Sequence, residues 1–270
     1  MKKKYFAVMG NPIAHSLSPH IHSLFAKQTN VALIYEKLLI EEQRFESAVH
    51  QFFLQGGQGL NITLPFKQRA FVMSAVKTDR CHTAGAANTL WIKESKLYAD
   101  NTDGVGLITD LERYTAIENK KILILGAGGA TRGILTPLFL KSPKTITVAN
   151  RTWAKAEELQ KEFPFIHISP MEQLEGEYDL ILNAISMRFD FSHALFSKNL
   201  FKDSSLCYDL SYNLERPTPF VALAKSSGCE VRDGLGMLVE QAAESFFIWN
   251  GIRPDTNKVL RELNKIGPFA

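Results

Sequence analysis

The apolar run Ile122-Leu123-Ile124-Leu125 leads directly into Gly126-Ala127-Gly128-Gly129-Ala130, and this junction decides the fold. Four consecutive apolar residues predict a buried strand, and the residues after the loop, with Ile134 and Leu138 on one face, predict a helix. Glycine permits a sharp turn and lets a pyrophosphate approach backbone N–H groups at the start of that helix. The junction therefore predicts a Rossmann-like dinucleotide site, although Thr131 stands where the motif often has a third glycine.

The end of the next expected strand, Thr145–Ala149, indicates which dinucleotide binds. A site for NAD carries Asp or Glu about 20 residues after the loop, where the carboxylate holds the ribose 2′-hydroxyl. This chain has Asn150-Arg151-Thr152 there, followed one turn later by Lys155. Since a guanidinium pairs well with a phosphate, the cluster predicts NADP as the cofactor.

Strands alternate with helices along the chain, which favours an α/β fold with parallel sheets crossed by helices. Strands are expected at Tyr5–Met9, Ile34–Ile40, Gly59–Leu64, Asn88–Ile92, Leu97–Ala99, Lys121–Leu125, Thr145–Ala149, Asp179–Asn183, Leu206–Leu210 and Glu230–Val231. Helices are expected after an N-cap at Ser18, at Glu41–Leu54, from Phe66, and at Gly104–Arg113, Trp153–Glu162, Met237–Asn250 and Asp255–Ile266.

The pattern predicts two domains. Residues 1–103 are expected to form the first domain and residues 104–236 a Rossmann-like NADP-binding domain, followed by helices in residues 237–270. The family resemblance described below implies that the first domain is the substrate-binding catalytic domain and that the last helices pack back on it. A chain of 270 residues with 45% hydrophobic and 22% charged residues is long enough for two such cores.

Composition excludes several classes of function. A net charge of +3, spread along the chain, does not indicate a nucleic-acid-binding protein. No apolar stretch approaches the roughly 18 residues that span a bilayer, and the apolar run after Lys2-Lys3-Lys4 is too short for a signal peptide. Three distant cysteines, Cys81, Cys207 and Cys229, fit reduced thiols in the cytoplasm. His15, His20 and His22 lack further ligands at metal-site spacing, so no metal is expected.

Three polar segments in the first half of the chain carry candidate chemistry. Ser16-Leu17-Ser18 places two hydroxyls beside a helix start, and Asn61–Lys67 ends a strand with polar residues before delivering a lysine. Asn88-Thr89 and Asp100–Gly104 bracket the expected hairpin around Glu94-Ser95 with amides and carboxylates. Each segment alone is equally compatible with a helix cap, a helix start or a turn.

Taken in order, these segments resemble the shikimate dehydrogenase family over essentially the whole chain. The matching stretches are Gly10–Pro19, Asn61–Lys67, Ala84–Thr89, Asn101–Gly106, Gly126–Gly133, Asn150–Thr152 and Asp233–Ala243. Several long matches in the same order make a chance likeness implausible. The resemblance implies a two-domain NADP enzyme that converts between 3-dehydroshikimate and shikimate on the route to chorismate and the aromatic amino acids.

The resemblance also implies roles for individual residues. Lys67 is the expected catalytic acid/base, paired with Asp103, because reduction of a keto group needs a proton for the new alkoxide. Ser16 and Ser18 are expected to hold the substrate carboxylate. The substrate hydroxyls are expected to contact Thr63, Asn88, Asp103 and Gln241, with Tyr212 nearby. The cofactor is expected to contact Gly126, Ala127, Gly128, Gly129, Ala130, Asn150, Arg151, Thr152, Lys155, Leu210 and Gly234.

One segment departs from the family pattern. Family members usually carry Asn-Ala-Thr-Ser-x-Gly after the fourth strand of the nucleotide domain, whereas this chain has Asn183–Arg188. Ile185 removes a hydroxyl, and Arg188 replaces a glycine where the backbone would pass close to the cofactor. Leu210 stands where methionine is common, a mild exchange. We expect NADP to bind, but more weakly than in relatives with the usual segment.

Three other functions compete with this interpretation. A quinate/shikimate dehydrogenase would be expected to use NAD, which Asn150 and Arg151 disfavour. A non-catalytic metabolite-binding regulator would be expected to lack Lys67 or Asp103. A folate or glutamyl-tRNA reductase relative would not carry the paired serines and Asn61–Lys67. The sequence leaves monomer and homodimer both open.

Overall fold

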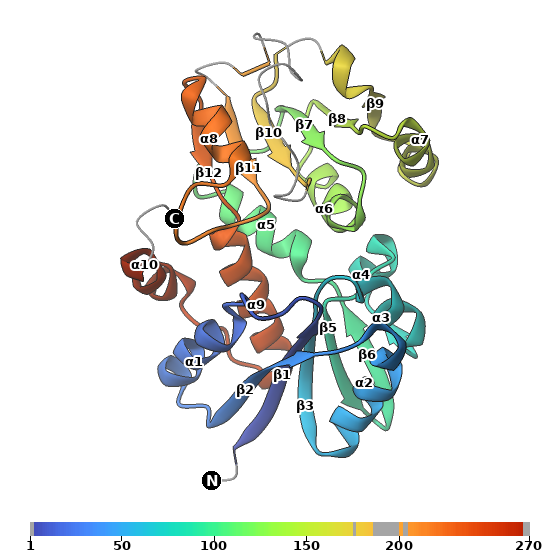
Figure 1. The fold of residues 1–270 in the computed structure, drawn as a ribbon, viewed down its shortest axis with the longest axis vertical. Coiled ribbons are helices and arrows are strands. Elements are labelled where there is room, and N and C mark those ends of the chain that lie inside the picture. The colour runs from blue at the N-terminus through green and yellow to red at the C-terminus, as the bar shows by residue number, and fades with distance from the viewer. Residues whose placement is uncertain (1–2, 175–176, 186–199, 202–204, 267–270) are drawn as a thin grey trace. The chain divides into compact units, whose positions relative to one another are not determined.

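The computed structural model describes residues 3–174, 177–185, 200–201 and 205–266 (Figure 1). The chain divides into two compact units. The first comprises Met1–Gly106 and Val239–Val259, and the second comprises Leu107–Leu238 and Leu260–Ala270. Each unit is built on its own six-stranded sheet, which confirms the expected α/β class.

The first unit contains a mixed sheet with the strand order β2-β1-β3-β5-β6-β4. Its strands are β1 (Lys4–Gly10), β2 (Leu33–Leu39), β3 (Gly57–Ile62), β4 (Val76–Lys77), β5 (Thr89–Lys93) and β6 (Lys96–Asp100). β1 runs parallel to β2 and β3, whereas β5 is antiparallel to β3 and β6. The carboxyl ends of β1, β2 and β3 therefore share one edge of this sheet.

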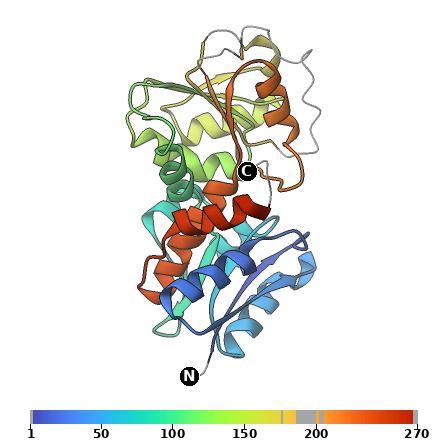
Figure 2. The same cartoon turned by 90° about the vertical axis from the view of Figure 1, so that its left-hand side faces the viewer.

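Helices cover both faces of the first sheet. The helices that lie wholly in this unit are α1 (Ser18–Thr29), the 3₁₀ turn η1 (Glu42–Arg44), α2 (Phe45–Leu54), α3 (Lys67–Met73) and α4 (Asp79–Ala84). On one face Phe6 of β1 stacks on Trp249 of α9 (Leu235–Asn250), and α1 packs on the same side in the view of Figure 2. On the other face Tyr5 packs against Phe52 of α2. Side chains of β1 alternate between the faces, as expected for a strand.

The second unit contains an all-parallel sheet with the order β12-β11-β10-β7-β8-β9. Its strands are β7 (Lys121–Leu125), β8 (Thr145–Ala149), β9 (His167–Ser169), β10 (Leu180–Asn183), β11 (Leu206–Asp209) and β12 (Glu230–Arg232). The strand order reverses direction between β7 and β10. The glycine loop follows β7 and therefore lies at the switch point where such sheets bind nucleotides.

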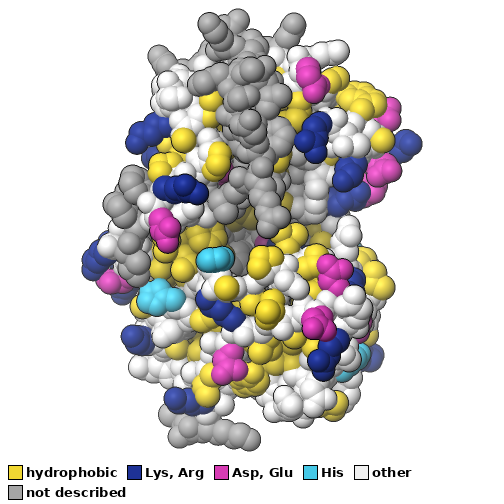
Figure 3. Space-filling model, in the orientation of Figure 1, with side chains coloured by type: hydrophobic (Ala, Val, Ile, Leu, Met, Phe, Trp, Pro, Cys, Tyr) yellow, Lys and Arg dark blue, Asp and Glu magenta, His cyan; other side chains and the backbone are white. Residues whose placement is uncertain are grey.

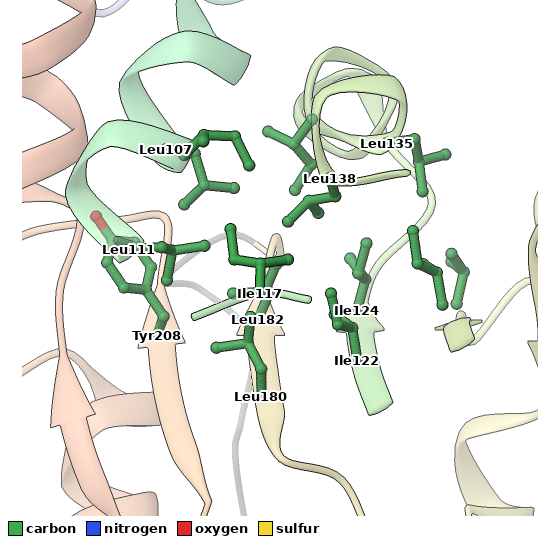
Figure 4. Close-up of a cluster of buried hydrophobic side chains, with 14 of the residues drawn as sticks. Leu107, Leu111, Ile117, Ile122, Ile124, Leu135, Leu138, Leu180, Leu182 and Tyr208 are labelled. Atoms are coloured by element: carbon green, nitrogen blue, oxygen red, sulfur yellow. The ribbon is translucent and has the colours of Figure 1, made fainter. Parts of the chain in front are cut away.

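In the described part of the second unit the helices are α6 (Gly129–Phe139), α7 (Trp153–Glu162), the 3₁₀ turn η2 (Met171–Gln173) and α8 (Pro219–Ser226). The chain crosses between the units within α5 (Asp103–Leu111), α9 and α10 (Thr256–Ile266). Figure 4 shows part of one core of the second unit, in which α5 and α6 contribute leucines to the face of the sheet. The labelled side chains are Leu107, Leu111, Ile117, Ile122, Ile124, Leu135, Leu138, Leu180, Leu182 and Tyr208.

Most expected elements are present, with ends that differ from the expected ones by at most two residues. The hairpin turn at Glu94 and Ser95 has positive φ at both residues (51° and 59°), as a type I′ turn requires. The helix expected at Glu41–Leu54 is instead the turn η1 followed by α2. The N-cap expected at Ser18 is wrong by one residue, since Leu17 precedes α1 and Ser18 is its first residue.

Candidate active site

Two loops that follow parallel strands form one edge of the first unit. The backbone N–H of Asn11, after β1, donates to the carbonyl of Leu64, after β3, at 2.9 Å. The N–H of Thr63 in turn donates to the carbonyl of Met9 at 2.9 Å. The loop that carries Ser16 is thereby fixed beside the segment that leads into Lys67, at the carboxyl edge where α/β sheets commonly bind ligands.

Lys67 and Asp103 form an ion pair in this unit. Lys67 is the first residue of α3 and Asp103 the first of α5, and Lys67 Nζ lies 2.6 Å from Asp103 Oδ2. The side chains are 28% and 11% exposed, respectively, so the carboxylate is largely enclosed while the ammonium still reaches solvent. A charge-assisted contact of this length orients the ammonium.

Asn88 holds the second oxygen of that carboxylate. Its Oδ1 accepts from the backbone N–H of Thr102 at 2.9 Å, which fixes the orientation of the amide. Its Nδ2 therefore faces Asp103 Oδ1, at 2.9 Å, and Gln241 Oε1, at 3.2 Å. Residues 67, 88, 103 and 241, far apart in the sequence, thus meet in one hydrogen-bonded cluster.

The two serines and Thr63 complete the polar residues expected in this unit. Ser16 Oγ donates to Ser18 Oγ at 3.2 Å, so the hydroxyls are adjacent. Thr63 is half-buried, and a Cβ on Gly10 would lie 2.4 Å from its Cγ2 methyl. Glycine at position 10 therefore makes room for Thr63.

Asn61 is a buried residue to which the sequence assigned no role. Its Oδ1 accepts from the hydroxyl of Tyr35 at 2.7 Å, and its Nδ2 donates to the carbonyl of Asn88 at 3.0 Å and to Ser245 Oγ at 3.1 Å. These bonds join Tyr35 of β2 and Ser245 of α9 to Asn88, which in turn contacts Asp103. Only the polar character of Asn61 at a strand end could have indicated this.

The glycine loop of the second unit has the backbone that a pyrophosphate needs. Gly126 has φ +103°, a conformation that favours glycine, and a Cβ there would lie 3.1 Å from Ile185. Gly128, Gly129 and Ala130 are exposed at the start of α6, which has no side-chain cap. Thr131 Oγ1 donates to the Gly126 carbonyl at 2.7 Å and so closes the turn. The residues present therefore fit a dinucleotide phosphate.

The polar cluster after β8 lies next to this loop. Asn150 accepts from the N–H of Ala127 at 3.2 Å and donates to the carbonyl of Thr152 at 2.8 Å, so it braces the loop. Arg151, Thr152 and Lys155 are exposed, as groups that bind a ribose phosphate must be.

Three expected residues follow β11 or precede α9. The backbone N–H of Leu210 donates to the carbonyl of Asn183 at 2.9 Å, and a Cβ on Gly234 would lie 2.2 Å from the Leu210 carbonyl oxygen. Only glycine fits position 234 without a shift of the backbone. Tyr212 is half-buried in the same unit.

Residues 183–188 form the segment that departs from the family pattern, and the structure describes the first three of them. Asn183 Oδ1 accepts from the N–H of Ile185 at 3.0 Å, and Asn183 Nδ2 donates to Asp209 at 2.9 Å. Ile185 packs against the apolar core on the α8 side of the sheet. Arg188, and with it the expectation of weaker NADP binding, lies outside the described residues.

The described residues also provide observations on thiols, metal sites, membrane-spanning helices and surface charge. Cys81, Cys207 and Cys229 are buried free thiols, as expected. Within the described ranges no three His, Cys, Asp or Glu side chains gather as a metal site, and no helix has the length and apolarity to cross a membrane. On the face drawn in Figure 3, the coloured acidic and basic side chains are interspersed.

Three family models match the chain. Residues 8–90 match the shikimate dehydrogenase substrate binding domain, residues 110–208 match shikimate / quinate 5-dehydrogenase, and residues 234–263 match the shikimate 5′-dehydrogenase C-terminal domain. A curated relative, shikimate dehydrogenase (NADP(+)) of Legionella pneumophila (strain Lens), is 53% identical over 258 residues, which cover 96% of this chain and 97% of the relative.

Solved structures of related enzymes are also similar to this chain over nearly its whole length. An Ael1 enzyme from Pseudomonas putida is 40% identical with a TM-score of 0.90, covering 97% of this chain and 98% of that one. The shikimate 5-dehydrogenase of Thermus thermophilus, in complex with NADP(H) and shikimate, is 30% identical with a TM-score of 0.86, covering 97% and 99%.

Proposed function

Because the chain belongs to the shikimate dehydrogenase family, we propose that it catalyses the NADP-dependent, reversible reduction of 3-dehydroshikimate to shikimate. The first unit would bind the substrate and the second the cofactor. The observation that carries the proposal is the Lys67–Asp103 pair, held at 2.6 Å beside the Asn88 amide.

Lys67 and Asp103 handle the proton in this proposal. NADPH, when bound, supplies a hydride to the C3 carbonyl carbon of the substrate. The carbonyl oxygen takes up the bonding electron pair and accepts a proton from the Lys67 ammonium. Asp103 holds that ammonium toward the substrate, and the partial exposure of Lys67 lets solvent return the proton. The reverse reaction runs through the same groups with Lys67 as the base.

The remaining residues bind and orient. Ser16 and Ser18 would bind the substrate carboxylate at the start of α1, where the helix dipole favours an anion. The substrate hydroxyls would contact Thr63, Asn88, Asp103, Tyr212 and Gln241. The pyrophosphate would lie on Gly126–Ala130, the ribose phosphate on Asn150–Thr152 and Lys155, and the nicotinamide near Leu210 and Gly234.

Replacement of Lys67 tests the proton role. We expect Lys67→Ala to lower kcat by about three orders of magnitude, within the range that acid–base catalysis supplies, and to leave shikimate binding nearly unchanged. Lys77→Ala is the matched control, because Lys77 lies on β4 and donates to the Ser74 carbonyl. Initial rates give kcat and calorimetric titration gives the Kd for shikimate. Wild-type turnover in Lys67→Ala would remove Lys67 from its role.

The substrate and cofactor are tested by one comparison. Initial rates with shikimate and quinate, each with NADP+ and NAD+, should be highest for shikimate with NADP+. Equal rates with quinate and NAD+ would favour a quinate/shikimate dehydrogenase, and no turnover of either would favour a binding protein. A cytoplasmic location and a monomeric or homodimeric state are further parts of the proposal.

A further inference from the structure

One face of β2 packs against α1. Tyr35 pairs with Phe6 in the sheet, and its ring stacks on His22 of α1, with centroids 4.2 Å apart and planes inclined by 11°. Ser18 lies one helical turn before His22 on α1. The helix that begins at the proposed carboxylate-binding serine therefore packs directly on β2.

Lys37 lies on this same face, because residues two apart in a strand point to one side. It pairs with Val8, near the carboxyl end of β1, and its Nζ donates to the carbonyl of Ala14 at 2.5 Å. Ala14 belongs to the loop that leads into Ser16, whose N–H donates to the carbonyl of Ile13 at 3.1 Å. The ammonium is thus fixed on the loop that presents the serine pair.

The charge of Lys37 is not neutralised locally. Among the residues that the structure describes, no carboxylate oxygen lies within 4.0 Å of its ammonium. The adjacent acid, Glu36, points to the opposite face of β2 and accepts from the hydroxyl of Tyr5 at 2.8 Å. The ammonium and the start of α1 therefore both make this loop electropositive.

We propose that Lys37 is a further substrate-binding residue, whose ammonium attracts the substrate carboxylate to the hydroxyls of Ser16 and Ser18. The proposal rests on the proposed function, which places that carboxylate at the serine pair. One N–H of the ammonium is used on Ala14, and the other two remain for the anion. Charge of this kind acts on association and on KM, not on the proton transfer at Lys67.

The test compares Lys37→Met, which removes the charge and keeps the stem, with Lys37→Arg, which keeps both. At about 20 mM salt we expect Lys37→Met to raise KM for shikimate about five- to tenfold, with kcat within about twofold of wild type. At about 300 mM salt the difference should shrink, because ions screen the attraction. Lys4→Met is the control, since Lys4 lies at the other end of β1 and bonds Asn250; it should behave as wild type.

The methyl ester of shikimate separates attraction from loop positioning. Its carboxyl is uncharged, so Lys37→Met should change its kcat/KM, or its inhibition constant against shikimate, by less than about twofold. An equal loss of kcat/KM for the ester and the acid would mean that Lys37 only holds the loop. An unchanged KM for shikimate would exclude both the attraction and the positioning of the loop. Either result overturns the proposal. Failure of the wild type to oxidise shikimate would instead refute the proposed function.

Discussion

A buried carboxylate beside the proposed active site depends on one arginine to compensate its charge. Asp100, the last residue of β6, has a side chain only 3% exposed. Arg80 of α4 donates to both of its oxygens, through Nε at 2.7 Å and Nη2 at 2.6 Å, and Nη2 also bonds Glu244 at 2.9 Å. The substitution Arg80→Met removes the guanidinium and keeps an apolar stem of similar length.

The expected loss of stability depends on the hydrogen bonds that Asp100 keeps in this variant. The hydroxyl of Thr78 at 2.6 Å and the N–H of Asn101 at 2.7 Å remain as donors, while both charge-assisted bonds disappear. Removing one partner of a buried ion pair costs about 3–5 kcal/mol. Because Arg80 is 31% exposed and two donors remain, we expect the free energy of unfolding of this unit to fall by about 3 kcal/mol.

Equilibrium urea unfolding, followed by tryptophan fluorescence, measures this change. The chain has three tryptophans, of which Trp91 and Trp249 lie in the first unit and Trp153 in the second. A Trp153→Phe background therefore reports the first unit alone. Arg69→Met is the matched control: its partner Glu46 is 44% exposed, so water replaces the lost contact and little stability is lost.

A second substitution identifies the cause of the loss. In the variant Arg80→Met with Asp100→Asn, the buried charge is gone while Oδ1 still accepts from Thr78 and Asn101, so part of the stability should return. A loss below about 1 kcal/mol in Arg80→Met, or no recovery in the double variant, would refute the reasoning that an uncompensated charge is responsible.

Two further substitutions test a half-buried carboxylate, Asp233, and a buried one, Asp110. Burial raises the pKa of Asp233 to about 6, above its value of 3.8 in an unfolded chain, so the free energy of unfolding falls as pH rises through this range. Asp233→Asn keeps the acceptor for the Leu235 N–H. This substitution should raise the free energy of unfolding by roughly 2 kcal/mol at about pH 7.5 and by little at about pH 4, as measured by urea unfolding. Equal effects at both pH values would contradict this prediction. A Cβ on Gly236 would lie 2.1 Å from the Asp110 carboxylate, so Gly236→Ala should lower Tm by about 5 °C, and an unchanged Tm in thermal unfolding would show that Asp110 moves freely.

Much of the fold could be predicted because its periodicity is strong. The run Ile122–Leu125 is buried on both faces, as a central parallel strand must be, and its apolar character was sufficient to place it. The pieces β4 and β9, with two and three residues, carry too few side chains to show a period, so they were missed. The helix α4, with six residues, was missed for the same reason.

The candidate site residues could be proposed from the sequence, but their contacts could not be derived from it. Lys67 and Asp103 were paired through the family resemblance, since nothing in a separation of 36 residues indicates a contact. Thr131 counted against the glycine motif, yet its hydroxyl closes the same turn by bonding the Gly126 carbonyl. A side chain that substitutes for a backbone feature in this way is not visible in a motif based on glycine positions.

Asn61 shows where the periodicity of a strand stops being informative. Asn61 and Thr63 are two residues apart, and the rule for strands places their side chains on one face. The strand β3 ends at Ile62, so the rule applies to Asn61 but no longer to Thr63. Asn61 is consequently 6% exposed and bonded to Tyr35 and Ser245, whereas Thr63 is half-buried. The polar residue inside the strand belongs to the buried hydrogen-bond network, whereas Thr63, the first residue after the strand, is partly accessible and is therefore the one of the two that we propose to contact the substrate.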